Sequence, residues 1–179
     1  LNHVKSLTLQ GVSVSCVIDN IQKKEISTWS KVTESLPGTL FRFIRKALVQ
    51  KLPTMSCLKR WGKKSTSACP LCTKDQTNKH VLSNCSAVLD RYTLRHNGVL
   101  YIIANYIKSS IPAHASLFAD IVGFDELSNV FLTLRPDIAV IQYPTIHVCE
   151  LTICHETNLI KSKNYKIDRY KNLEKDLTT

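Results

Sequence analysis

The stretch DIAVIQYPTIHVCELTI, residues 137–153, contains two short runs of β-branched and apolar residues on either side of Tyr143 and Pro144. A further run, NVFLTL at 129–134, precedes this stretch and is separated from it by an Arg-Pro turn signal. Runs of this length and composition, bounded by turn residues, are typical of β-strands. The sequence therefore predicts a meander of three strands, at 129–134, 137–142 and 146–153.

This predicted hairpin places two carboxylates opposite each other. If Tyr143 and Pro144 form a two-residue turn, the antiparallel register pairs Asp137 with Glu150 on one face of the sheet. Acidic side chains in such a pair repel each other unless a cation lies between them. Carboxylate oxygens suit Mg²⁺ or Mn²⁺, an arrangement found in metal-dependent phosphodiester hydrolases. The alternative is two acids exposed at the sheet edge, and a turn of another length would remove the pairing.

The segment 156–177 returns to helical spacing after the meander. One stripe of this predicted helix consists of Leu159, Lys166, Tyr170, Leu173 and Leu177. A lysine at a core-facing position needs a partner, so Lys166 could reach the carboxylate pair and orient an attacking water or offset charge on the phosphorane. Lys163 shares this face one turn earlier. The alternative is a lysine whose stem is buried and whose ammonium group reaches solvent.

A helix is also predicted before the meander, over residues 93–109. Its apolar stripe consists of Val99, Ile102, Ile103, Tyr106 and Ile107. Arg95 and His96 lie at the start of the same face and are expected to point inward, which is unusual in a purely structural helix. The alternative is a capped or salt-bridged pair.

Upstream, CPLCTKDQTNKHVLSNC at residues 69–85 has the spacing C-x2-C-x7-H-x4-C. Three thiols and one imidazole in so short a segment suit one tetrahedral zinc ion, which would be structural and would have no open position. The ligands are Cys69, Cys72, His80 and Cys85. Chance clustering is the alternative, and a disulfide framework is disfavoured because the chain has seven cysteines. The other four are expected to be reduced, as in the nucleus or cytosol.

The charge of the chain is concentrated in front of this zinc motif. Nine of the 24 basic residues and none of the 14 acidic residues fall between Ser35 and Lys74, so the rest of the chain is nearly neutral. Such a block on a folded segment favours a polyanion, and we expect nucleic acid. A solvated basic face or a docking surface for an acidic protein is the alternative. The residues expected to bind nucleic acid are Arg42, Arg45, Lys46, Lys59, Arg60, Trp61, Lys63 and Lys64.

This basic segment contains an amphipathic helix and a tryptophan surrounded by cations. Residues 39–50 have the pattern of a basic amphipathic helix, which we expect to pack on the domain and not on a membrane. Trp61 lies among four cations and could stack on a base or ribose, or could equally pack against the zinc module.

The chain has no apolar run long enough for a membrane span and no evident secretion signal. It also lacks an initiator Met, so we expect it to be a piece of a longer protein.

Several short motifs occur in one order along the chain. The basic segment is followed by the CPLC…H…C unit, RHN at 95–97, RPD at 135–137, ELT at 150–152 and an E-x-N-L…K-x-x-R-Y-x-x-L tail. This ordered set, over about residues 40–177, resembles the C-terminal region of site-specific non-LTR retrotransposon proteins. That region carries a zinc knuckle and a restriction-like endonuclease of the PD-(D/E)XK type.

The resemblance implies an α/β fold with a restriction-endonuclease-like core. It implies that Asp137 and Glu150 hold catalytic Mg²⁺ or Mn²⁺ and that Lys166 replaces the lysine of the E-x-K position, where Thr152 stands. The residues it places in the DNA cleft are Arg95, His96, Arg135, Arg169 and Tyr170. The implied partners are double-stranded DNA, the RNA of the element and the reverse-transcriptase domain of the same polypeptide, in the nucleus.

The expected organisation is a helical basic linker at 1–56, a CCHC zinc knuckle at 57–92 and an endonuclease core at 93–179. The expected function is to nick target DNA so that the 3′-hydroxyl primes reverse transcription. The alternative is a non-catalytic nucleic-acid-binding module with a vestigial nuclease fold.

Overall fold

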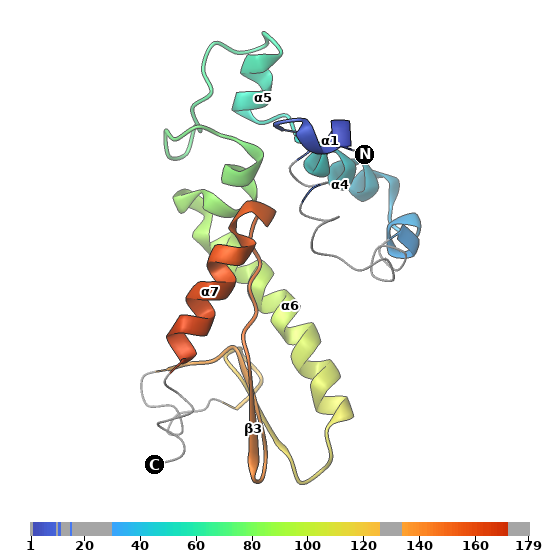
Figure 1. Ribbon diagram of the computed structural model, residues 1–179, viewed down its shortest axis with the longest axis vertical. Coiled ribbons are helices and arrows are strands. Elements are labelled where there is room, and N and C mark those ends of the chain that lie inside the picture. Colours follow the sequence, from blue (N-terminus) through green and yellow to red (C-terminus); the bar gives the residue numbers. More distant parts are fainter. Residues whose placement is uncertain (1, 10, 12–14, 16–29, 126–133, 172–179) are drawn as a thin grey trace. The chain divides into compact units, whose positions relative to one another are not determined.

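The computed structural model of the 179-residue chain describes residues 2–9, 11, 15, 30–125 and 134–171. The chain forms two compact units (Figure 1). Unit 1 comprises Leu1–Ala87 and Cys154–Asn158, and unit 2 comprises Val88–Ile153 and Leu159–Thr179. The architecture is mixed α and β, as the sequence predicts. None of the helices in the described part of the chain combines the length and apolarity that a membrane crossing requires.

Unit 2 contains a three-stranded antiparallel sheet in the order β1-β2-β3. The strands are β1 Ser116–Ala119, β2 Ile138–Gln142 and β3 Thr145–Cys149. The meander is therefore present, but its first strand is β1 rather than 129–134. Residues 129–133 of the predicted strand lie outside the described residues, and Leu134 is not in a strand. β1 has only four residues, too few for a distinct alternating pattern.

The hairpin register agrees with the prediction. Ile138 pairs with Cys149 and Gln142 with Thr145, which leaves Asp137 and Glu150 as the next pair beyond the ladder. β3 ends at Cys149, four residues before the predicted end at Ile153. Because the turn has two residues, the side-chain alternation of the two strands stays in phase.

The long helix α6, Leu89–Ser110, begins four residues before the predicted start. It covers one face of the sheet (Figure 1), where Leu100 and Ala104 form a core with Ala119, Ile138 and Val140. The predicted stripe is only partly correct. Ile103 and Ile107 pack on this core, whereas Val99, Ile102 and Tyr106 are exposed. The buried residues of α6 are Leu100 and the small Ala104.

The opposite face of the sheet is lined by Ala139, which packs with Phe118, Val148 and Tyr170. Tyr170 is the last residue of α7, Leu159–Tyr170, which follows the short 3-10 turn η3 at Glu156–Asn158. The predicted helix residues Leu173 and Leu177 lie outside the described residues. Leu159 is exposed, so the apolar stripe predicted for this helix does not begin at that residue.

In its described residues, unit 1 has short helices and few buried apolar side chains. Its described elements include α1 Asn2–Ser6, α4 Gly38–Leu48, α5 Met55–Arg60, the π-turn η1 His80–Asn84, the 3-10 turn η2 Ser86–Val88, which runs into unit 2, and η3. The helix predicted at 39–50 is present as α4, but none of its residues is buried. Its apolar side chains Leu40, Phe41 and Leu48 are partly exposed, and the Ala47 carbonyl accepts a hydrogen bond from Asn78 Nδ2 at 3.3 Å.

Candidate functional site

Asp137 and Glu150 are linked across the end of the β2–β3 hairpin. The Asp137 N–H donates to Glu150 Oε1 at 3.3 Å, and the Leu151 N–H donates to Asp137 Oδ2 at 2.7 Å. The two side chains are 15% and 12% exposed. Each carboxylate therefore accepts a hydrogen bond from the backbone beside the other, which holds both at one point of the sheet edge.

Lys166 of α7 extends to both of these carboxylates. Its Nζ lies 3.4 Å from Asp137 Oδ2 and donates to Glu150 Oε2. Burial alone would lower the pKa of Lys166, but the hydrogen bond to Glu150 and the charge of Asp137 outweigh it and raise the pKa. The lysine is therefore a cation that offsets the repulsion between the two acids. Lys163, predicted to share this face, is exposed.

His96 of α6 is the fourth member of this cluster. Its Nε2 lies 3.5 Å from Asp137 Oδ1, and its Nδ1 lies 3.2 Å from Asn97 Oδ1. The imidazole points inward from the helix, as predicted. Arg95 has a different neighbour, because its guanidinium lies 5.4 Å from the centre of the Tyr92 ring.

Tyr170 and Arg135 are connected to the cluster through the loop before β2. The Tyr170 hydroxyl donates to the Arg135 carbonyl at 3.2 Å, and the Arg135 guanidinium pairs with Asp120 Oδ1. Burial and the neighbouring Glu150 raise the pKa of Tyr170 well above its usual range. The Arg169 guanidinium lies 5.6 Å from the centre of the Tyr170 ring. Sequence reasoning missed Asp120, which directly follows the unpredicted strand β1.

A second group lies in unit 1 and contains the four residues predicted to bind zinc. The possible ligand atoms of Cys69, Cys72, His80 and Cys85 all lie within 4.8 Å of one another. Among the described residues, this is the one group of three or more Cys, His, Asp or Glu side chains so assembled. Cys72 Sγ and Cys85 Sγ are 3.8 Å apart. Two zinc–sulfur bonds at a tetrahedral angle require about 3.8 Å. The group can therefore hold one metal ion and is compatible with a structural zinc.

The backbone around Cys69 forms a tight turn. The Cys69 N–H donates to the Lys74 carbonyl at 2.7 Å, and the Thr73 N–H donates back to the Cys69 carbonyl at 2.9 Å. Thr73 has a φ of 65°, in the left-handed region that such a turn requires. Gln76 links this turn to α5, because its Oε1 accepts the Met55 N–H at 2.9 Å and its Nε2 lies 3.7 Å from Cys69 Sγ.

The thiols of this group have opposite tendencies to ionise. A hydrogen bond from the Leu71 backbone lowers the pKa of Cys69 to about 6, helped by His80 and opposed by burial. Burial raises the pKa of Cys85, and the neighbouring thiols raise it further. Because metals bind the thiolate form, a bound cation would remove the obstacle to ionising Cys85.

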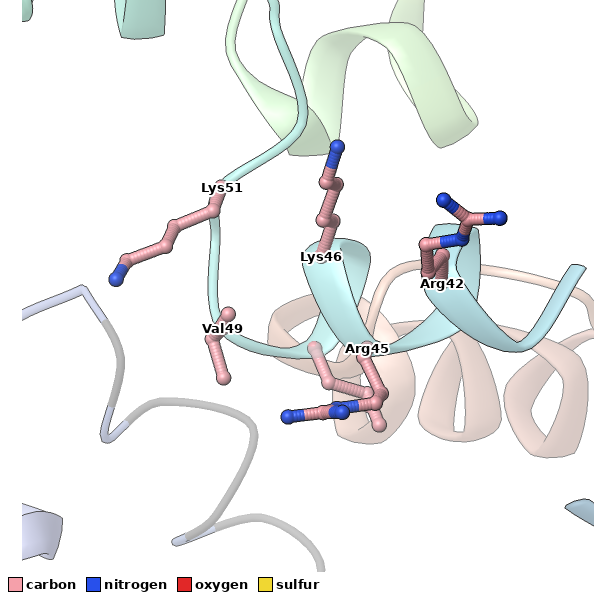
Figure 2. A pocket seen from close by; sticks show the side chains of 6 residues that line it. Arg42, Arg45, Lys46, Val49 and Lys51 are labelled. Atoms are coloured by element: carbon pink, nitrogen blue, oxygen red, sulfur yellow. The ribbon is translucent and has the colours of Figure 1, made fainter. Parts of the chain in front are cut away.

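The residues predicted to bind nucleic acid are all exposed in unit 1. Four cations from α4 and the segment after it line a hollow of about 590 Å³, together with Leu48 and Val49. These cations are Arg42, Arg45, Lys46 and Lys51. In Figure 2 the ends of Arg42 and Lys46 extend upward and those of Arg45 and Lys51 lie lower in the view, so the four charged ends do not converge on one point. Such an arrangement suits an extended polyanion better than one small anion.

The second basic group follows α5. Trp61 is the C-cap residue of this helix, and its side chain is 44% exposed. A ring this accessible can stack on a base. Arg60 is held locally, since its Nη2 lies 3.4 Å from the Gln50 carbonyl oxygen and 3.0 Å from Cys57 Sγ.

Comparisons of the chain with protein-family models, with curated proteins and with solved structures find no match.

Proposed function

We propose that this chain is a metal-dependent DNA endonuclease domain that nicks target DNA to prime reverse transcription of a non-LTR retrotransposon. The proposal rests on one observation above all: Lys166 Nζ contacts the carboxylates of both Asp137 and Glu150. These three residues come from three separate segments, and the sequence pattern predicts that they share one site. The restriction-like core and the retrotransposon origin rest on the resemblance of the motifs.

The donor chemistry of the cluster suits a hard divalent cation. Asp137 and Glu150 offer carboxylate oxygens, and each oxygen can accept more than one partner. A bound Mg²⁺ or Mn²⁺ supplies Lewis acidity toward the scissile phosphate and lowers the pKa of a bound water. Asp137 and Glu150 would hold the ion and orient the phosphate beside it.

Lys166 carries the remaining chemistry in this proposal. Its ammonium group would hold the attacking water in line and offset the charge that develops on the phosphorane. Water adds to phosphorus, the bond to the 3′-oxygen breaks, and that oxygen takes up a proton. The products are a 5′-phosphate and the 3′-hydroxyl that reverse transcription would extend.

The zinc group and the basic segment have a positioning role in this proposal. With four protein ligands, a zinc ion at Cys69, Cys72, His80 and Cys85 would have no open site for chemistry. The exposed cations of α4 and α5 would hold the DNA backbone or the element RNA by charge, without reading sequence.

A supercoiled plasmid tests the catalytic role. Wild type with Mn²⁺ or Mg²⁺ is expected to nick the plasmid, whereas Asp137→Ala and Lys166→Ala are expected to lose about 100-fold or more of the rate. Lys161→Ala is the matched control, because it removes an exposed charge from the same helix. Equal nicking by all four proteins would refute the assignment. Tight DNA binding without any nicking by wild type would support the non-catalytic alternative.

A further inference from the structure

The two oxygens of Asp137 have different surroundings. Oδ2 accepts the Leu151 N–H at 2.7 Å and lies 3.4 Å from Lys166 Nζ. Oδ1 instead faces His96, whose Nε2 is 3.5 Å away. One oxygen is therefore occupied by cationic and backbone donors, and the other is directed at an imidazole.

The neighbouring Asn97 determines what this imidazole offers. His96 Nδ1 lies 3.2 Å from Asn97 Oδ1, and an amide oxygen can only accept a hydrogen bond. Nδ1 therefore carries the hydrogen, and in the neutral ring Nε2 presents a lone pair. That lone pair faces the lone pairs of Asp137 Oδ1. Such a pair is satisfied by a positive charge between the two atoms, supplied either by a proton on Nε2 or by a metal ion.

We propose that His96 Nε2 and Asp137 Oδ1 are joint ligands of the divalent ion, and that the nitrogen ligand makes this site prefer Mn²⁺ to Mg²⁺. Two bonds of about 2.2 Å that meet at 90–110° place their ligand atoms about 3.1–3.6 Å apart. The observed 3.5 Å separation lies within this range. Mg²⁺ favours oxygen ligands, whereas Mn²⁺ accepts an imidazole nitrogen more readily.

Asn97 has a supporting role in this site. A metal-bound histidine usually donates its other N–H to an acceptor, which fixes the ring orientation and the tautomer. The contact between His96 Nδ1 and Asn97 Oδ1 fits that description. The inference rests on the proposed nuclease function, but metal binding can be measured without DNA.

The experiment uses the zinc-loaded full chain and titrates Mn²⁺ by electron paramagnetic resonance, with Mg²⁺ as competitor. Wild type is expected to bind one Mn²⁺ that Asp137→Ala abolishes. His96→Gln is expected to weaken Mn²⁺ binding by about tenfold and Mg²⁺ binding by less than about twofold. His114→Gln, which removes an exposed histidine of the same unit, is the matched control and is expected to change neither.

A measurement on wild type keeps the test independent of how the variants fold. Pulsed electron paramagnetic resonance of the Asp137-dependent Mn²⁺ is expected to show coupling to a ¹⁴N nucleus. Absence of that coupling overturns the inference, as does equal weakening of both metals in His96→Gln. Plasmid nicking then separates the two proposals. Nicking with an unchanged metal preference in His96→Gln refutes this inference alone, and nitrogen coupling without nicking refutes the nuclease function alone.

Discussion

Lys166 Nζ lies 3.4 Å from Asp137 Oδ2, although 29 residues separate the two in sequence. Its second partner is Glu150, so one ammonium group is shared by two carboxylates that are themselves linked through the backbone. All three side chains are at most 25% exposed. The cluster therefore joins α7 to the β2–β3 hairpin and affects stability as well as the proposed chemistry.

Removing this ammonium group should destabilise unit 2. Lys166→Ala leaves two partly buried carboxylates without their cation, and we expect a loss of about 1–3 kcal/mol in the free energy of unfolding. Chemical denaturation measures this loss. In the double variant Lys166→Ala/Glu150→Gln the repulsion is relieved, so its loss should be smaller than the sum of the two single losses. Additive losses would show that the three groups are not coupled.

Metal removal should unfold unit 1 selectively. The buried side chains of this unit include Cys69, His80 and Cys85, so the metal would replace much of an apolar core. A chelator, or Cys69→Ser, should abolish binding of about one zinc per chain and remove the folded signals of unit 1 in an NMR spectrum. Cys149→Ser, at an exposed cysteine of β3, should retain the zinc. A folded unit 1 that contains no metal would contradict this prediction.

The hairpin is predictable from sequence because its signal is local. A two-residue turn and the period-two alternation determine which residues pair, so the sequence alone places Asp137 opposite Glu150. The C-x2-C-x7-H-x4-C group is predictable for a related reason, since its spacing alone brings the four ligand atoms together.

The remaining features depend on contacts distant in sequence. β1 is a strand because Leu117 and Ala119 pair with Val140 and Ile138, not because Ser116–Ala119 has a strong pattern. The buried face of α6 is likewise set by where Ala104 meets the sheet, and the apolar residues Ile102 and Tyr106 could not reveal this. Asp120 was missed because its position follows from β1.

The free energy of unfolding of unit 1 should decrease as the pH is lowered below about 6.5. His155 is 7% exposed, and its Nδ1 accepts the Thr157 N–H at the start of η3. Burial lowers the pKa of His155, and Lys79 lowers it further against the opposing charge of Glu156. As the pH falls through 6.5, His155 therefore becomes protonated in the unfolded chain but stays neutral in the folded chain. Stability decreases as the pH falls below that value and is unaffected above it.

The comparison of wild type with His155→Gln isolates this contribution from the pH dependence of zinc binding, which both proteins share. Denaturation midpoints between pH 5 and 8 should converge toward low pH, because the variant lacks the group that resists protonation. Parallel curves for the two proteins would show that His155 titrates normally in the folded chain.

DNA affinity should depend on salt through the cations of α4. If the exposed side chains of Arg42, Arg45 and Lys46 each neutralise one phosphate, the slope of log K against log salt concentration should become less negative by about 2.7 in the triple alanine variant. Fluorescence anisotropy with one duplex at several salt concentrations measures that slope. A variant with lysine at positions 42 and 45 keeps the charge and should keep the slope. If its slope becomes as shallow as that of the alanine variant, the guanidinium geometry and not the charge binds the phosphates.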